Sequence, residues 1–314
     1  MGFRDRLPQF DGPLFLTDGG IETTLIFHQG LDLPEFAAFD LLKDDEGTEA
    51  LRSYYAPYAE LARDRGLGFV LESPTWRANP DWAARIGYGL AELEAMNRKA
   101  ISLMEELRNV YETPAAPFVI SGCVGPQSDG YQPSTRMTPG EAEDYHATQI
   151  ATFADTAADL VTAITMTYAE EAIGVVRAAR RVGMPAVISF TVETDGRLPS
   201  EQALGEAIEQ VDAETGEAAA YFMVNCAHPT HFAHALAEGE EWVGRIRGLR
   251  ANASTKSHAE LDEAVELDEG DPADLGAQHA ALPRRLPNLA VLGGCCGTDH
   301  RHVAEICDAL LAPA

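Results

Sequence analysis

Three cysteines lie where two apolar segments end, a placement that suits metal or redox chemistry. Cys226 ends the segment VNC, and Cys295 and Cys296 are adjacent within GGCCG. Zinc binds thiolates in a tetrahedral arrangement, and three protein ligands leave a fourth position for a substrate. Neighbouring side chains of a strand point in opposite directions, so both vicinal cysteines reach one ion only where the chain leaves the strand. The flanking glycines permit such a turn.

The residues alone leave several interpretations of these cysteines open. They are metal ligands, a redox pair, or small buried side chains, which a single cysteine at a strand end usually is. Neither a C-x-x-C spacing nor a basic flank is present to activate a redox pair. Cys123 and Cys307 are predicted to be core residues. Five cysteines in a long chain with no secretory signal argue against a disulfide framework.

The elements that must position these residues are predicted to be those of a barrel. Apolar runs rich in Val, Ile and Phe alternate with segments of helical spacing, which indicates a parallel sheet. An open doubly wound sheet is the alternative, but no G-x-G-x-x-G follows the first run. We therefore predict a single-domain (β/α)₈ TIM barrel over residues 1–314. The expected strands are 14–18, 68–72, 118–123, 160–165, 186–191, 221–226, 245–249 and 290–294, and the expected helices are 48–65, 90–107, 139–158, 169–181, 199–211 and 301–311.

In such a barrel, the loops after the strands form the active-site face. The three cysteines therefore converge on one rim, together with the polar residues that follow the first two strands. Two threonines, Thr138 and Thr298, are interpreted as helix caps. The irregular acidic segment 254–276 is expected to be a solvated loop or short helix, with an oligomer contact as the weaker alternative.

Charge and hydropathy exclude some partners. The formal net charge of −27 opposes binding to nucleic acid, whose phosphates are neutralised by Lys and Arg. The chain has no long apolar run and no signal-like start, so we expect a cytoplasmic protein that does not associate with membranes.

Six motifs resemble the homocysteine S-methyltransferases, a family that includes betaine-dependent and S-methylmethionine-dependent enzymes and the homocysteine half of cobalamin-dependent methionine synthase. The resemblance covers residues 14–311, and its NC and GGCCGT motifs are the most specific. The motifs are LTDGG at 16–20, SGCVGP at 121–126, ISFTVETDGRL at 188–198, VNCAHP at 224–229, RANAS at 250–254 and LGGCCGT at 292–298.

The resemblance implies a TIM barrel that holds a zinc cofactor through Cys226, Cys295 and Cys296, with the acceptor thiol as fourth ligand. It also implies that Asp18 contacts the acceptor's amino group. Gly19 would let the acceptor approach the backbone. The implied partners are a small thiol acceptor, homocysteine, and a cationic methyl donor, with methionine as product. A homo-oligomer is left open.

One position departs from the family pattern. The strand-four motif of the family has a glutamate that also holds the homocysteine ammonium, and here Ile164 stands in its place. An ammonium left without that carboxylate in a desolvated site loses several kcal/mol of binding free energy. Either Glu22 or Glu72, which follow the first and second strands, substitutes for the missing glutamate, or the acceptor is a different thiol.

Alternatives of other classes remain open at the level of sequence. A zinc hydrolase or lyase would use metal-bound water and a general base. A non-catalytic zinc-binding or thiol-binding barrel is a further alternative. Aromatic residues such as Trp76, Trp82 and Tyr131 suit a cationic donor, but such rings are more often packing residues.

Overall fold

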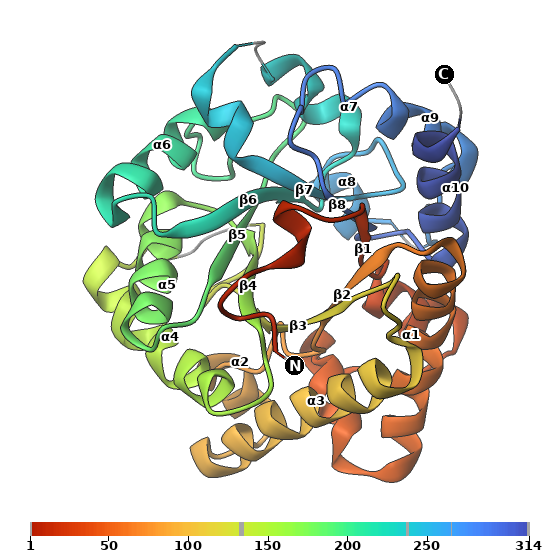
Figure 1. Ribbon diagram of the computed structural model, residues 1–314. Helices are drawn as coiled ribbons and strands as arrows, with labels where there is room; N and C mark the ends of the chain where they lie inside the picture. Colours follow the sequence, from red (N-terminus) through yellow and green to blue (C-terminus); the bar gives the residue numbers. More distant parts are fainter. Residues whose placement is uncertain (1, 132–134, 237–238, 265, 313–314) are drawn as a thin grey trace.

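The apolar runs form the eight strands of one closed parallel barrel in this computed structural model (Figure 1), which describes residues 2–131, 135–236, 239–264 and 266–312. The strands follow one another in chain order, and the eighth pairs in parallel with the first. The predicted barrel is therefore confirmed. The strands are β1 Phe15–Leu16, β2 Gly68–Glu72, β3 Phe118–Val124, β4 Leu160–Met166, β5 Ala186–Thr191, β6 Ala219–Asn225, β7 Ile246–Ala251 and β8 Val291–Gly294.

Helices cover the outside of the barrel, and no helix in the described ranges is long and apolar enough to cross a membrane. The α-helices are α1 Asp45–Arg65, α2 Pro80–Arg85, α3 Leu90–Tyr111, α4 Pro139–Ala154, α5 Ala169–Arg181, α6 Leu204–Thr215, α7 Pro229–Phe232, α8 His258–Asp262, α9 Pro272–Ala280 and α10 His300–Leu311. Shorter helical turns are η1 Pro8–Phe10, η2 Thr23–His28, η3 Pro34–Phe36, η4 Ala38–Lys43, η5 Ala233–Ala235 and η6 Glu241–Arg245.

Side chains at the helix starts test the two predicted caps. The cap of α4 is confirmed, because the Thr138 hydroxyl accepts from Glu141 N and the Glu141 carboxylate accepts from Thr138 N. The predicted cap of α10 by Thr298 is wrong. Asp299 caps this helix instead, and its carboxylate accepts from Arg301 N at 2.9 Å.

Helix α6 begins later than predicted, at Leu204 rather than at residue 199. The preceding residues form a turn in which Arg197 and Ala203 make an isolated β-bridge. This bridge requires extended backbone, which excludes helix over the same residues.

The N-terminal segment closes the end of the barrel opposite the rim where the cysteines lie, and Figure 1 shows it in dark red across the barrel opening. Leu7 packs against inward-facing side chains that include Phe15, Val119 and Val187. Buried Asp159 anchors the segment. Its carboxylate accepts from Phe3 N, from Ile120 N and from the Arg108 guanidinium at 2.6, 2.9 and 3.0 Å.

Replacing Asp159 with asparagine is expected to lower the free energy of unfolding by about 3 kcal/mol, because the partly buried Arg108 loses its charged partner. Urea denaturation measures the change. Asp155→Asn is the matched control, since the side chain of Asp155 is 75% exposed. This control should change the free energy by less than about 0.5 kcal/mol. Equal effects at the two sites would contradict the role of Asp159 as the buried partner of Arg108.

Candidate active site

The sulfur atoms of Cys226, Cys295 and Cys296 gather at one point on the rim, all within 4.8 Å of one another. Cys226 directly follows β6, and the vicinal pair directly follows β8. Both segments are tied to β7, because Cys226 N donates to Arg250 O and Cys295 N donates to Ala251 O, at 3.0 and 2.8 Å. The strands therefore bring together the three cysteines that the sequence selected.

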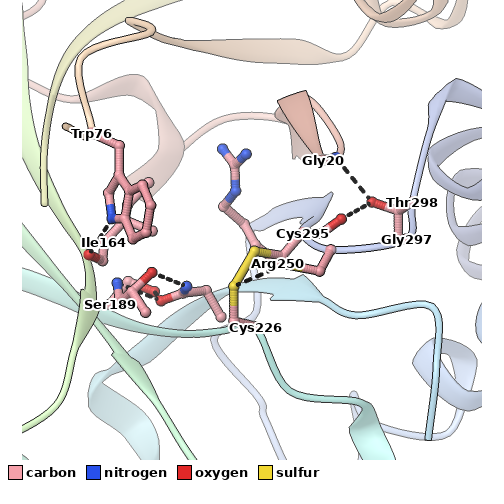
Figure 2. The surroundings of a disulfide bond; sticks show 12 residues. Gly20, Trp76, Ile164, Ser189, Cys226, Arg250, Cys295, Gly297 and Thr298 are labelled. Atoms are coloured by element: carbon pink, nitrogen blue, oxygen red, sulfur yellow. Dashed lines mark hydrogen bonds between the residues drawn. A yellow bond between two sulfur atoms is a disulfide. The ribbon is translucent and has the colours of Figure 1, made fainter. Parts of the chain in front are cut away.

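The backbone around these cysteines departs from strand geometry, as the sequence predicted. Cys226 has a φ of 52°, which is unfavourable for a residue with a side chain, and Gly297 has a φ of 78°. The Thr298 hydroxyl donates to Cys295 O at 2.7 Å and accepts from Gly20 N at 3.2 Å (Figure 2). This role in holding the cysteine turn explains why Thr298 does not cap α10.

Two of the three cysteines, Cys226 and Cys295, are joined by a disulfide in the structure (Figure 2). Cys296 is not part of this disulfide, and its sulfur lies 3.9 Å from that of Cys226. The number of cysteines argued against a disulfide framework, and it did not predict this single bond, which lies within the sulfur cluster itself. A set of three thiolates therefore exists only in the reduced protein.

The chemistry of the sulfur cluster suits a soft or borderline metal ion, because thiolates are ligands that zinc prefers. A second group of potential ligands, His28, Glu269 and Asp299, also lies within 4.8 Å. Arg301 already pairs with both of its carboxylates, which offsets part of the negative charge that would attract a cation. The sulfur cluster is therefore the stronger candidate for a metal centre.

A histidine that the sequence analysis missed supports the cluster. His258 Nε2 lies 2.6 Å from Cys226 O, and Nδ1 lies 3.2 Å from a Glu193 carboxylate oxygen. The imidazole ring also packs on Tyr131 at a centroid distance of 4.3 Å. The Tyr131 hydroxyl donates to Cys226 Sγ at 3.4 Å and lies 3.6 Å from Cys296 Sγ.

His258 belongs to the acidic segment 254–276, of which residue 265 lies outside the described residues. A solvated loop or short helix was expected in this segment, and it does contain the short helix α8. It also lines the cavity over the cysteines. One signal was available in the sequence. Ser257 and Glu260 form a capping box, S-x-x-E, which marks the start of α8.

Asp18 is buried and already has a cationic partner. Its carboxylate accepts from the Arg250 guanidinium at 2.8 Å, from Thr17 Oγ1 at 2.9 Å and from the Tyr54 hydroxyl at 2.7 Å. Figure 2 shows Arg250 projecting from the cysteine cluster towards the loop that carries Gly20. Because a carboxylate offers about four acceptor positions, Asp18 retains one for a ligand.

Gly19 is required by packing as well as by any substrate. A side chain there would place its Cβ 2.7 Å from the Tyr58 hydroxyl and 3.0 Å from Thr298 O. Such contacts are closer than van der Waals distance. A larger residue at this position would therefore displace the β1 loop from the cysteine turn.

Two carboxyl groups in the cavity have raised pKa values. Burial raises the pKa of Glu72 to about 7, opposed by the positive charge of Arg250. Burial also raises the pKa of partly buried Glu22 to about 7. Glu72 is 5% exposed, and its Oε2 atom has no hydrogen-bond partner among the described residues. A buried carboxylate with an unpaired oxygen is stabilised by a cationic ligand, which compensates for the lost hydration.

The position of the missing glutamate is apolar in the structure as well. Ile164 is buried and lines the cavity, and its carbonyl accepts from Trp76 Nε1 at 3.3 Å. The next residue, Thr165, has a φ of 66° and is held by Asn225. The Asn225 amide accepts from Thr165 N and from Ser189 Oγ, at 3.0 and 2.7 Å, which ties β4 and β5 to the end of β6.

These groups surround one cavity of about 440 Å³, a size suited to small-molecule ligands. Trp76 and Tyr131 line it, whereas Trp82, in the described chain, stacks outside the lining between two arginines. The predicted site residues all line the cavity: Asp18, Gly19, Glu22, Glu72, Cys226, Cys295 and Cys296.

Comparisons with known proteins agree on one family. The family model described as homocysteine S-methyltransferase matches residues 15–310. The oxidized form of MmuM, a homocysteine methyltransferase from Escherichia coli, is similar in structure with 20% identity, a TM-score of 0.69 and 96% coverage of both chains. Its metallated form has 18% identity, a TM-score of 0.71 and 96% coverage of both chains. A search of curated proteins found no match.

The disulfide leads to a prediction about thiol counts. Protein prepared with a chelator, oxidised in air and then unfolded should show three reactive thiols, and five after reduction. Titration with a chromogenic disulfide reagent in guanidinium chloride measures both numbers. A Cys226→Ala variant should give the same count before and after reduction. Five thiols in the oxidised wild type would contradict the disulfide.

Proposed function

The chain belongs to the homocysteine S-methyltransferase family, and from this premise we propose that it methylates the thiol of homocysteine in the cavity above the three cysteines. The product is then methionine. The observation that carries the proposal is the convergence of Cys226, Cys295 and Cys296 at the edge of a cavity large enough for two small substrates. The family match favours methyl transfer over a zinc hydrolase or an inert thiol-binding barrel.

We assign the three cysteines as ligands of zinc in the reduced protein. Their sulfurs are already close enough to share one ion, and three thiolates leave a position for the acceptor. Zinc held by these cysteines would lower the pKa of a bound acceptor thiol, which would then be a thiolate at neutral pH. His258 and Thr298 hold the carbonyls of Cys226 and Cys295, and their part is to orient the sulfurs.

The acceptor's ammonium group is assigned to Glu72 and Asp18. Glu72 offers an oxygen that has no partner among the described residues, and Asp18 has one acceptor position left beside Arg250. Glu72 thereby substitutes for the family glutamate that Ile164 replaces. Gly19 keeps the β1 loop close to the cysteine turn, which leaves its backbone accessible to the acceptor. Glu22, further along the same loop, is the second candidate carboxylate.

The reaction itself is a displacement at carbon. The acceptor thiol releases its proton to solvent, and its sulfur attacks the methyl carbon of a sulfonium or quaternary ammonium donor. The bond from that carbon to the donor atom breaks, the donor keeps the electron pair, and it leaves as a neutral sulfide or amine. The faces of Trp76 and Tyr131 suit the donor cation, whose charge is lost as the bond breaks.

Cys226→Ala is expected to lower bound zinc to below about a tenth of the wild-type content and to abolish methionine formation, because two thiolates hold zinc poorly. Elemental analysis and mass spectrometry of the reaction measure the two effects. Cys307→Ala is the matched control, since Cys307 is buried in α10 away from the cavity. The assignment is wrong if the Cys226 variant keeps both properties.

Glu72→Gln should raise the KM for homocysteine about ten- to a hundredfold, because a charge-assisted hydrogen bond to the ammonium is lost. In the wild type, this KM should rise as the pH falls below about 7, where Glu72 becomes protonated. The variant should lack that pH dependence. Steady-state kinetics between about pH 6 and 8 test this. A larger effect of Glu22→Gln would assign the ammonium to Glu22 instead.

A further inference from the structure

A buried arginine at the edge of the cavity has no role in the steps described so far. Arg77 follows β2 on the same loop as Trp76 and lines the cavity further from the strand end than Glu72 does. Its side chain is only 6% exposed. A guanidinium is always charged and is rarely buried without a partner, so its environment indicates what it binds.

Aromatic rings hold the Arg77 guanidinium in place. Its central carbon lies 4.1 Å from the ring centroid of Trp76 and 3.4 Å from that of Trp82. These contacts orient the planar group, but they satisfy none of its N–H donors in the plane of the guanidinium. Arg77 is therefore fixed before any ligand binds.

The hydrogen-bonding capacity of Arg77 is largely unused. Nε and Nη1 have no hydrogen-bond partner in the described part of the chain. Nη2 lies 3.9 Å from a carboxylate oxygen of Asp129, whose side chain is 46% exposed. Burial lowers the pKa of Arg77 to about 10 despite the nearby carboxylates of Asp129 and Glu22. The protein alone thus leaves a desolvated cation incompletely compensated, and an anionic ligand would correct this.

We propose that Arg77 binds the carboxylate group of the methyl donor. This inference rests on the proposed function, because it takes the acceptor to lie between the sulfur cluster, Asp18 and Glu72. Those residues border the strand ends, whereas Arg77 and Asp129 lie further along their loops and line the same cavity, which leaves them to a second substrate.

The charge of the donor supports the same assignment. An onium cation in a desolvated cavity is repelled by a buried guanidinium, and this repulsion rises steeply as the dielectric constant falls. A donor that carries a carboxylate pairs with Arg77 through that group and places its cationic end near Trp76 and Tyr131. Arg77 therefore selects donors that combine an onium centre with a carboxylate and rejects simple onium ions.

The test compares two donors with their amides, which keep the onium centre and lose the carboxylate. S-methylmethionine and trimethylammonioacetate are titrated by calorimetry into the reduced, zinc-loaded protein, each beside its amide. For at least one pair, the wild type should bind the acid about ten- to a hundredfold more tightly than the amide. Arg77→Gln should remove this preference. Arg85→Gln is the matched control, because Arg85 stacks on Trp82 but its side chain is 57% exposed.

Asp129→Asn provides a test with the opposite sign and without a change at a buried residue. Removing the competing carboxylate should increase the preference for the acid about two- to fivefold. No preference for either acid in the wild type, or an unchanged preference in Arg77→Gln, overturns the inference. If Arg77→Gln fails to fold, an unchanged or reduced preference in Asp129→Asn overturns it.

Methyl-transfer assays separate this inference from the proposed function. Wild-type methylation of homocysteine, together with a preference that does not depend on Arg77, leaves the function standing and removes the inference. If the preference for the acid depends on Arg77 but no methyl transfer occurs, the proposed function is wrong and Arg77 still marks a carboxylate subsite. If Arg77→Gln raises only the KM of homocysteine, the carboxylate that Arg77 binds belongs to the acceptor, and the donor assignment is overturned.

Discussion

Two backbone hydrogen bonds to β7 determine where the chemistry of this protein takes place. Successive carbonyls of a strand point to opposite sides, so Arg250 O reaches Cys226 on one neighbouring strand and Ala251 O reaches Cys295 on the other. The strand order makes β6 and β8 the two neighbours of β7. The strands therefore bring the sulfurs together, and His258 and Thr298 in the loops hold the carbonyls of Cys226 and Cys295.

Charge is the second constraint on the cavity, because its ionisable groups are removed from water. Asp18 and Arg250 compensate each other within the protein. Among the described residues, Glu72 Oε2 and Arg77 Nε and Nη1 have no hydrogen-bond partner. A cavity in which a carboxylate and a guanidinium both have unused hydrogen-bonding capacity is suited to substrates with both charges. Amino-acid-like molecules have this property, and simple alkyl thiols and onium ions do not.

The sequence predicts the barrel from local signals, and the barrel in turn predicts that the three cysteines meet on one rim, whereas their role as metal ligands follows from the resemblance. Apolar runs mark the strands, and glycines beside Cys295 and Cys296 mark the turn. The pairing of Asp18 with Arg250 is not predictable in this way, since 232 positions separate the two residues. His258 lies in a segment whose acidic composition suggested only solvation. The disulfide depends on oxidation state, which the pattern of residues does not encode.

Ile164, which stands where the family has a glutamate, bears on where the ammonium group of the proposed acceptor would lie. With isoleucine at the end of β4, the wall that it shares with Trp76 is apolar, and an ammonium placed there would lose its hydration without gaining a partner. In the proposed assignment, the acceptor's ammonium lies with Asp18 and Glu72, which are buried on the side of β1 and β2. The apolar wall would then be left to the methyl groups of the donor, which carry no hydrogen-bonding requirement. A carboxylate on β2 rather than on β4 would change the orientation of the acceptor and keep its sulfur at the cysteines.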